Sequence, residues 1–139
     1  MVCCDGKGLA RIIHGHCPGS LNDLENYYSS ELYTEPGLYF GLGTKAIADG
    51  SFARVEVDRF ISPVCYIRGR GLTVQETRFN IYHSWDRSIV ENFFGRMKLY
   101  CPVIQNFRFA VDKINIIFTA AVIMTNIRIK YQSPLRNWN

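Results

Sequence analysis

Two acidic residues stand at positions where sites often form: Asp49 at the end of a short apolar run, and Glu91 inside a predicted helix. Residues 45–49 are mostly apolar and are followed by Gly50, which predicts a buried strand that delivers Asp49 to its carboxyl end. That edge of an open α/β sheet is where ligands bind. Because carboxylate oxygens are the preferred ligands of hard divalent cations, a close approach of Asp49 and Glu91 would create a cation site.

Each candidate also has an ordinary structural explanation. Arg87 precedes Glu91 by one helical turn, and surface ion pairs at this spacing are common and weakly stabilising. Asp49 stands before a glycine, where aspartates often form turns. Asp23 falls in the first turn of a predicted helix, where the helix dipole favours an acidic side chain. From the residues alone, an ion pair explains Glu91 better and a turn explains Asp49 better.

The elements that would position these residues alternate between strands and helices. Residues 2–4 and 9–14 are predicted to form two short strands, joined by a turn at Asp5-Gly6-Lys7-Gly8. Ser20 or Asn22 can cap a helix whose apolar residues recur at helical spacing as far as Leu32, and Pro36 ends it. One α/β domain over residues 1–139 is the resulting expectation.

The second half of the chain reads as loop followed by helices. Residues 51–70 are expected to be mostly loop around one short strand near residues 64–67. A short helix over residues 73–80 would precede a longer one over residues 85–100, which Ser84 caps and Pro102 stops. A final helix over about residues 111–127 is apolar on most sides, which suits an element packed across a sheet.

The composition bounds the class of protein. In 139 residues, 47% are apolar and 14% aromatic, which argues for a buried core and against intrinsic disorder. The most apolar segment, residues 114–124, is far shorter than the roughly 20 residues that a membrane span needs. Five irregularly spaced cysteines favour a reduced, intracellular compartment. Histidines and cysteines near the start lack the spacing of a zinc site.

The charge favours no partner strongly. Sixteen Lys and Arg against twelve Asp and Glu give a net charge of +4, which attracts polyanions but is common in other proteins. The basic residues are spread along the chain, so any polyanion surface must be assembled by folding. Beside Glu91, the cations Arg87, Arg96 and Lys98 could contact DNA phosphates, although solvation is the default for such side chains.

Short motifs in a fixed order carry a family resemblance. They are Val2-Cys3-Cys4-Asp5, Pro18-Gly19-Ser20-Leu21-Asn22-Asp23, Ala48-Asp49-Gly50-Ser51-Phe52, Phe60-Ile61-Ser62-Pro63, Arg78-Phe79-Asn80, and Arg87-Ser88-Ile89-Val90-Glu91-Asn92-Phe93-Phe94-Gly95-Arg96-Met97-Lys98. Their order and spacing resemble the DDE endonuclease domain of Harbinger-type transposases over nearly the whole chain, and the conjunction is far more specific than any single motif.

The resemblance implies a ribonuclease-H-like fold, in which a mixed sheet with flanking helices brings carboxylates to one end. By motif, Asp49 corresponds to the second catalytic Asp, Glu91 to the helical Glu, and Asp23 to a further acidic position that helps to hold metal. It also implies a divalent cation, Mg²⁺ or Mn²⁺, DNA as the substrate, and nuclear localisation. Target recognition would come from a separate segment or from a DNA-binding partner protein, and no membrane is implied.

One catalytic position of the resembled family has no counterpart in these residues. The first catalytic Asp would lie on an opening strand before Val2, so we expect an N-terminally truncated domain that lacks this strand. Hydrolysis by two metals needs several carboxylates, and losing one should leave little cleavage. The alternative function is a catalytically inactive transposase remnant that serves as a nucleic-acid or protein interaction module.

Overall fold

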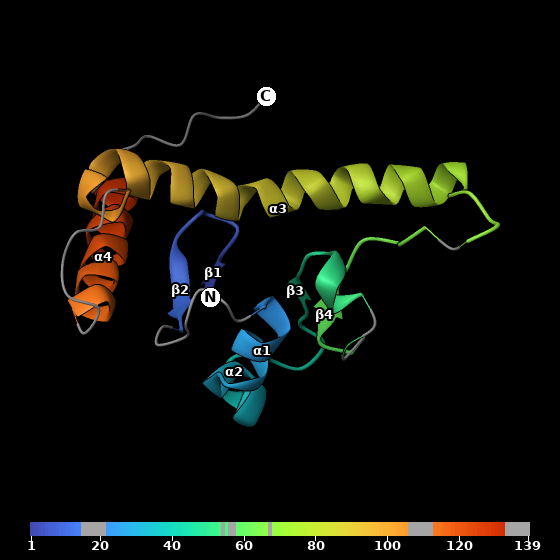
Figure 1. Cartoon of the computed structure of the whole chain (residues 1–139), viewed down its shortest axis with the longest axis horizontal. Coiled ribbons are helices and arrows are strands. Elements are labelled where there is room, and N and C mark those ends of the chain that lie inside the picture. The colour runs from blue at the N-terminus through green and yellow to red at the C-terminus, as the bar shows by residue number, and fades with distance from the viewer. Residues whose placement is uncertain (15–21, 54, 56–57, 67, 106–112, 133–139) are drawn as a thin grey trace. The chain divides into compact units, whose positions relative to one another are not determined.

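Short strands and helices alternate along the chain, which confirms the mixed α/β class (Figure 1). The structure is a computed structural model that describes residues 1–14, 22–53, 55, 58–66, 68–105 and 113–132. Its strands are β1 (Val2–Cys4), β2 (Ala10–Ile13), β3 (Ala46–Ile47) and β4 (Phe60–Ile61). Its helices are α1 (Asp23–Tyr28), α2 (Glu31–Thr34), α3 (Val74–Tyr100) and α4 (Ile114–Gln132), with 3₁₀ turns η1 (Pro36–Leu38), η2 (Gly50–Phe52) and η3 (Pro102–Ile104).

The chain divides into two compact units. Unit 1 comprises Met1–His16 with Ile89–Asn139, and unit 2 comprises Cys17–Ser88. Strands β1 and β2 form an antiparallel pair in unit 1, whereas β3 and β4 form a parallel pair in unit 2. The single ribonuclease-H-like sheet that the resemblance implies would have to join strands of both units, and it stays a prediction.

The hairpin of unit 1 is held by the carboxylate of Asp5, as the Asp-Gly turn predicts. Asp5 Oδ1 accepts hydrogen bonds from the amides of Lys7 at 2.9 Å and Leu9 at 3.0 Å, and Oδ2 accepts one from Arg11 Nε at 2.7 Å. Burial raises the pKa of Asp5, but these hydrogen bonds outweigh it and hold the pKa below its ordinary value. Gly8 supplies the positive φ, 75°, that the turn needs.

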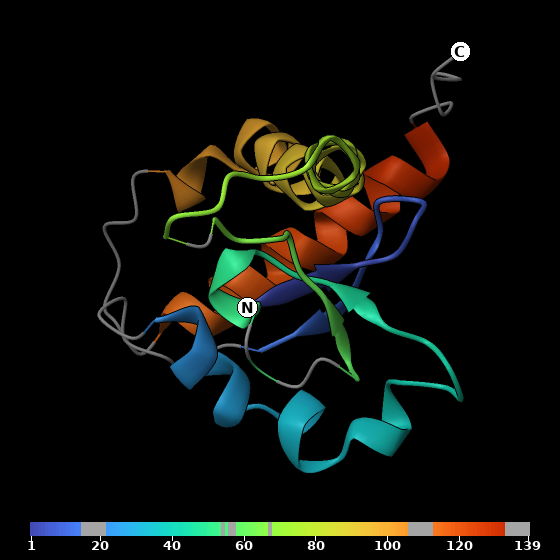
Figure 2. The same ribbon diagram turned by 90° about the vertical axis from the view of Figure 1, so that its right-hand side faces the viewer.

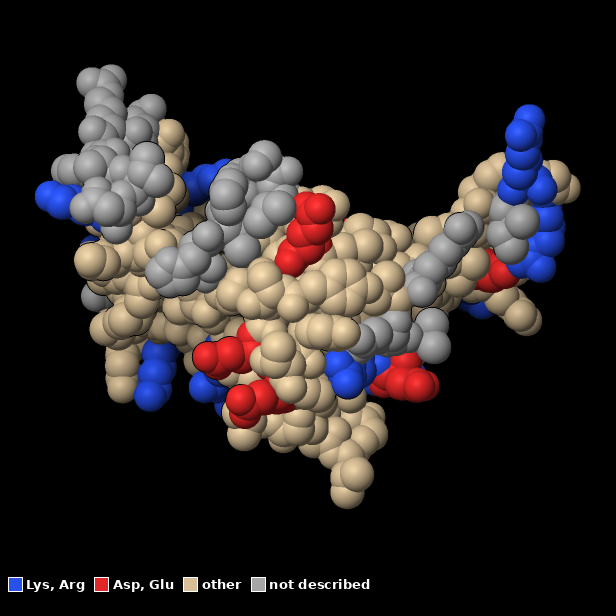
Figure 3. All heavy atoms as spheres, turned by 60° about the horizontal axis from the view of Figure 1, so that its bottom comes forward, with Lys and Arg blue, Asp and Glu red and all other residues tan. Residues whose placement is uncertain are grey.

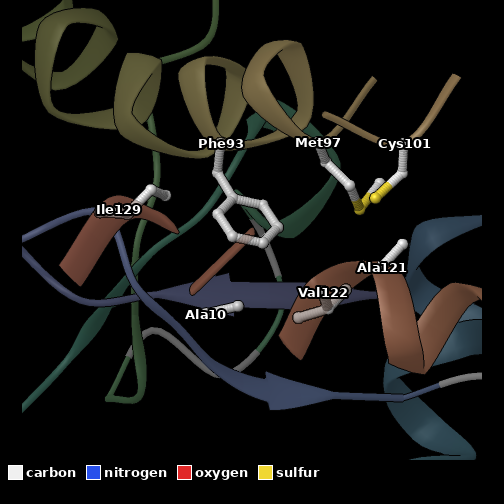
Figure 4. Close-up of a cluster of buried hydrophobic side chains, with 7 residues drawn as sticks. All are labelled: Ala10, Phe93, Met97, Cys101, Ala121, Val122 and Ile129. Atoms are coloured by element: carbon white, nitrogen blue, oxygen red, sulfur yellow. The ribbon is translucent and has the colours of Figure 1, made fainter. Parts of the chain in front are cut away.

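A hydrophobic core joins the hairpin of unit 1 to its helices. Figures 1 and 2 show α4 and the β1–β2 hairpin on the same side of the C-terminal part of α3. In Figure 4 the labelled side chains of α3 point toward those of α4, and Ala10 of β2 lies below Phe93 and beside Val122. The buried members of this core are Ala10, Phe93, Met97, Cys101, Ala121, Val122 and Ile129. Phe93 and Met97, four residues apart, therefore define the inward face of this part of α3.

A side-chain amide ties the same two elements together. Asn126 of α4 accepts a hydrogen bond from the amide of Ala10 at 2.9 Å through Oδ1 and donates one from Nδ2 to the carbonyl of Ala10 at 2.8 Å. Both backbone groups of Ala10 are thereby satisfied at a position where an unpaired group would be costly.

Aromatic rings form the core of unit 2. Tyr27 of α1 is fully buried, and its ring meets those of Phe60 at 5.0 Å and Phe52 at 5.7 Å between centroids. Phe52 and Phe60 also meet, at 4.9 Å. These edge-to-face and tilted contacts hold α1, η2 and β4 together, so the turn after β3 is anchored by Phe52.

Two helical predictions are wrong in their boundaries, for identifiable reasons. The single helix expected before Pro36 is two, α1 and α2, because the hydroxyls of Ser29 and Ser30 bond the carbonyls of Asn26 and Tyr27 at the break. The two helices expected over residues 73–80 and 85–100 are one, α3. Its start is a capping box, in which Thr73 and Glu76 bond each other's amides, so Ser84 lies inside the helix and caps nothing.

Other boundaries also differ. The strand expected near residues 64–67 lies at Phe60–Ile61, because the backbone of Val64 is bonded to a side chain instead of a strand. Helix α4 begins at Ile114 and runs to Gln132, and the earlier start expected near residue 111 lies outside the described residues. No described helix is long and apolar enough to cross a membrane. The cysteines at positions 3, 4, 65 and 101 are free.

The core of unit 1 gives a stability test. Phe93 is 1% exposed, so Phe93→Ala should lower the free energy of unfolding by about 3–5 kcal/mol through lost burial and a residual cavity. Leu99→Ala is the matched control, because Leu99 lies on the same helix and is 72% exposed; it should cost less than about 0.5 kcal/mol. Urea denaturation followed by circular dichroism measures both, and equal losses would contradict the assigned core.

Candidate functional site

Asp49 follows β3 directly and begins the next turn. Strand β3 pairs in parallel with β4, and the amide of Ala48 still bonds the carbonyl of Ile61 at 2.9 Å. Asp49 then caps η2: its Oδ1 accepts hydrogen bonds from the Ser51 amide at 2.9 Å and from the Ser51 hydroxyl at 2.5 Å. Asp49 thus follows a strand, as predicted. It also forms a turn with Ser51, which the sequence offered as the purely structural explanation of this residue. The strand is shorter than expected, and Ile47 on it is exposed, not buried.

The capping bonds use one oxygen of the Asp49 carboxylate. Among the described residues, no hydrogen-bond partner contacts Oδ2. Asp49 is half-buried, so its carboxylate is fixed in orientation by Ser51 while remaining open to solvent. A carboxylate held in this way can offer its second oxygen to a ligand without reorganising.

Asp49 lines a hollow in unit 2 of about 390 Å³. The lining comes from the β3–η2 turn, the segment after β4 and one face of α3, and consists of Asp49, Gly50, Ser51, Pro63, Asn80, His83, Ser84 and Arg87. Asp49 is the carboxylate of this set and Arg87 the permanent cation. A hollow with one carboxylate and one guanidinium can take a ligand that carries both an anionic group and a bound cation.

Two side chains of α3 fix the backbone that borders the hollow. Asn80 accepts a hydrogen bond from the amide of Val64 at 2.8 Å through Oδ1 and donates one from Nδ2 to the carbonyl of Val64 at 3.0 Å. His83, only 6% exposed, lies with Nε2 at 3.1 Å from the carbonyl oxygen of Ile61. Because a carbonyl oxygen only accepts, Nε2 carries the hydrogen. Helix α3 therefore holds β4 and the following segment, and β4 in turn holds β3 and Asp49.

The remaining predicted site residues lie elsewhere. Asp23 is exposed in the first turn of α1, beside the capping residue Asn22, and does not line the hollow. Glu91 is exposed on α3, one turn after Arg87, in the part of the helix that belongs to unit 1. Since Asp49 belongs to unit 2, the approach of Asp49 and Glu91 stays a prediction.

The two other predicted DNA contacts also lie in unit 1. Arg96 is half-buried on α3, and Lys98 is exposed in its last turn. The carbonyl of Lys98 accepts a hydrogen bond from Gln105 Nε2 at 3.1 Å. Within the described residues, no three His, Cys, Asp or Glu side chains gather into a group that could hold a metal ion.

Sequence reasoning found Asp49 and Arg87 but missed the role of three residues of α3 that also line the hollow. Asn80 entered only as part of a motif, His83 was passed over, and Ser84 was assigned to a helix cap. The available signal was their spacing, because positions 80, 83, 84 and 87 share one face of a continuous helix. That signal could be used only if α3 was recognised as one helix.

A mixed α/β fold with a fixed carboxylate at the carboxyl end of a strand is typical of proteins that bind ligands at the edge of a sheet. A comparison with protein families makes this specific: the model of the DDE superfamily endonuclease family matches residues 1–126. The chain belongs to this family. No curated protein and no solved structure matched the chain in the same comparisons.

The Asn80 contacts can be tested through backbone protection. Asn80→Ala leaves both polar groups of Val64 unpaired and should cost about 1–3 kcal/mol, with faster amide hydrogen exchange at Val64 and along β3 and β4. Asn92→Ala, an exposed asparagine on the same helix, is the control and should leave exchange in this segment unchanged. Unchanged protection in Asn80→Ala would show that the amide does not hold the segment.

Proposed function

We propose that this chain is a divergent metal-dependent DNA endonuclease domain of the transposase-derived type, whose reaction is the hydrolysis of phosphodiester bonds and whose cleavage is expected to be slow. The observation that carries the proposal is the Asp49 carboxylate, oriented by Ser51 and placed in a hollow with Arg87, in a chain of the DDE superfamily endonuclease family. DNA as the substrate favours nuclear localisation. A separate DNA-binding partner protein would select the target DNA sequence.

The residues of the hollow fit a divalent cation in part. Mg²⁺ and Mn²⁺ prefer carboxylate oxygen and are often held by one or two carboxylates together with water and substrate phosphates. Asp49 supplies the first carboxylate, and its Oδ2 is the atom that would bind. We propose Glu91 as the second. Positions 80, 84, 87 and 91 recur along one face of a helix, so Glu91 continues the face whose earlier members line the hollow.

Each residue has a distinct role in this proposal. A bound cation would activate the attacking water and neutralise the departing oxygen. Asp49 and Glu91 hold the cation, and Asp23 is retained from the family pattern as a further ligand. Arg87 binds the phosphate beside Asp49, because its planar guanidinium matches phosphate oxygens. Arg96 and Lys98 contact the DNA backbone further along α3.

Cation binding provides the test, because two carboxylates can hold a cation even where cleavage is slow. Calorimetry with Mn²⁺ should show binding that weakens by about tenfold or more, roughly 1.4 kcal/mol, in Asp49→Asn and in Glu91→Gln. Asp86→Asn, which removes an exposed carboxylate of α3 outside the hollow, should bind as the wild type does.

Nicking of supercoiled DNA in Mg²⁺ or Mn²⁺ is the second measurement. Activity that is lost in Asp49→Asn and Glu91→Gln but kept in Asp86→Asn would support the assigned ligands. Absence of cation binding in the wild type would instead favour the inactive interaction module, and equal loss in all three variants would contradict the assigned ligands.

A further inference from the structure

The first half of α3 exposes aromatic rings that neither the core nor the hollow uses. Tyr82 is 57% exposed and Trp85 65% exposed. Their rings meet edge to face, with centroids 5.4 Å apart and planes at 90°, so each ring keeps an open face. Arg78 is also exposed, one helical turn before Tyr82. We call Arg78, Tyr82 and Trp85 the stacking surface.

The stacking surface lies on a different side of α3 from the hollow. Positions 78, 82 and 85 recur at helical spacing and share one face. Positions 80, 83, 84 and 87, which line the hollow, point about half a turn away at roughly 3.6 residues per turn. A ligand bound to these rings would therefore be separate from one bound beside Asp49.

The charge over the start of α3, N-terminal to the rings, is positive, whereas the residue next to Trp85 is the exposed acid Asp86. Figure 3 shows Lys and Arg side chains gathered over the start of α3 around an acidic group. The described basic residues of that stretch are Arg68, Arg70 and Arg78, all exposed, and the acidic residue is Glu76, which is already paired with Arg70. The excess of guanidinium groups suits a polyanion.

We propose that the stacking surface binds a segment of single-stranded DNA, with bases stacked on Tyr82 and Trp85 and phosphates contacted by Arg78 and its basic neighbours. Open ring faces beside arginines are the combination that binds single strands without sequence preference. The bases of a duplex are already stacked on one another and cannot reach these rings. The inference rests on the proposed function in taking DNA as the ligand, and it adds a contact for strands opened next to a cleavage site.

Fluorescence of Trp85 offers a direct test. The chain has two tryptophans, so Trp138→Phe leaves Trp85 as the single indole. Titration with oligo(dT) in EDTA, which excludes any cation effect, should quench this indole as bases stack on it. In parallel, the anisotropy of a labelled oligo(dT) should report an affinity about tenfold weaker in Trp85→Ala and in Arg78→Gln. Trp85→Phe keeps a ring and should restore most of the affinity.

Tyr131→Ala is the matched control. Tyr131 is 72% exposed on α4 with the ammonium of Lys130 5.1 Å from its ring, so it reproduces an exposed aromatic beside a cation in unit 1. Its loss should leave oligo(dT) affinity unchanged. The proposal is overturned if the Trp85 indole is not quenched at saturation, if Tyr131→Ala weakens binding as much as Trp85→Ala, or if a duplex of equal length quenches equally.

The test separates this inference from the proposed function. Asp49→Asn should lose cation binding and keep the quenching of Trp85. Quenching of Trp85 by oligo(dT) without cation binding in the wild type would support the stacking surface and contradict the nuclease proposal. Cation binding without quenching would do the reverse, and would leave a protein partner as the occupant of these rings.

Discussion

The fold depends on two asparagine side chains, each of which forms hydrogen bonds with both the amide and the carbonyl of one backbone residue. Asn126 bonds Ala10 in unit 1, and Asn80 bonds Val64 in unit 2. The strands in the described part of the chain have two to four residues, so their ladders contain few hydrogen bonds. In each case one side-chain amide on a helix both donates and accepts, and so supplies two hydrogen bonds that an adjacent strand would otherwise make. Replacing either asparagine with an apolar residue would leave two backbone groups unpaired.

The same constraint explains how Asp49 is positioned. Asn80 and His83 hold the segment from Ile61 to Val64 by hydrogen bonds. The parallel pairing of β4 with β3 fixes β3 in turn. Ser51 then sets the orientation of the Asp49 carboxylate. The ordinary explanation of Asp49 as a turn-forming residue and its proposed role as a ligand are compatible, because capping uses Oδ1 and a ligand would use Oδ2. Membership of the DDE superfamily endonuclease family gives this geometry a chemical context that the hollow alone lacks.

The structural features that could be predicted from the sequence are those that depend on residues close together in the chain. The hairpin follows from Asp5 and its glycines, the end of α3 from Pro102, and the strand before Asp49 from a short apolar run, since each depends on neighbouring residues. The start of α3 differs from the prediction because Ser84 has the residue type of a helix cap, whereas the capping box is formed by Thr73 and Glu76. Contacts such as Asn80 with Val64 link residues 16 positions apart and carry no local pattern. The proposed pairing of Asp49 with Glu91 would be longer in range still, and it rests on the family pattern.

Helix α3 runs without interruption for 27 residues and contributes to both units. Each unit therefore obtains part of its core or its hollow from the same stretch of hydrogen-bonded backbone, since Ser88 and Ile89 are consecutive residues of α3. Helix formation is cooperative, so fraying that begins at one end must be arrested within the helix itself. The turns of α3 that line the hollow therefore belong to the same cooperative helix as the turns that carry Phe93 and Met97.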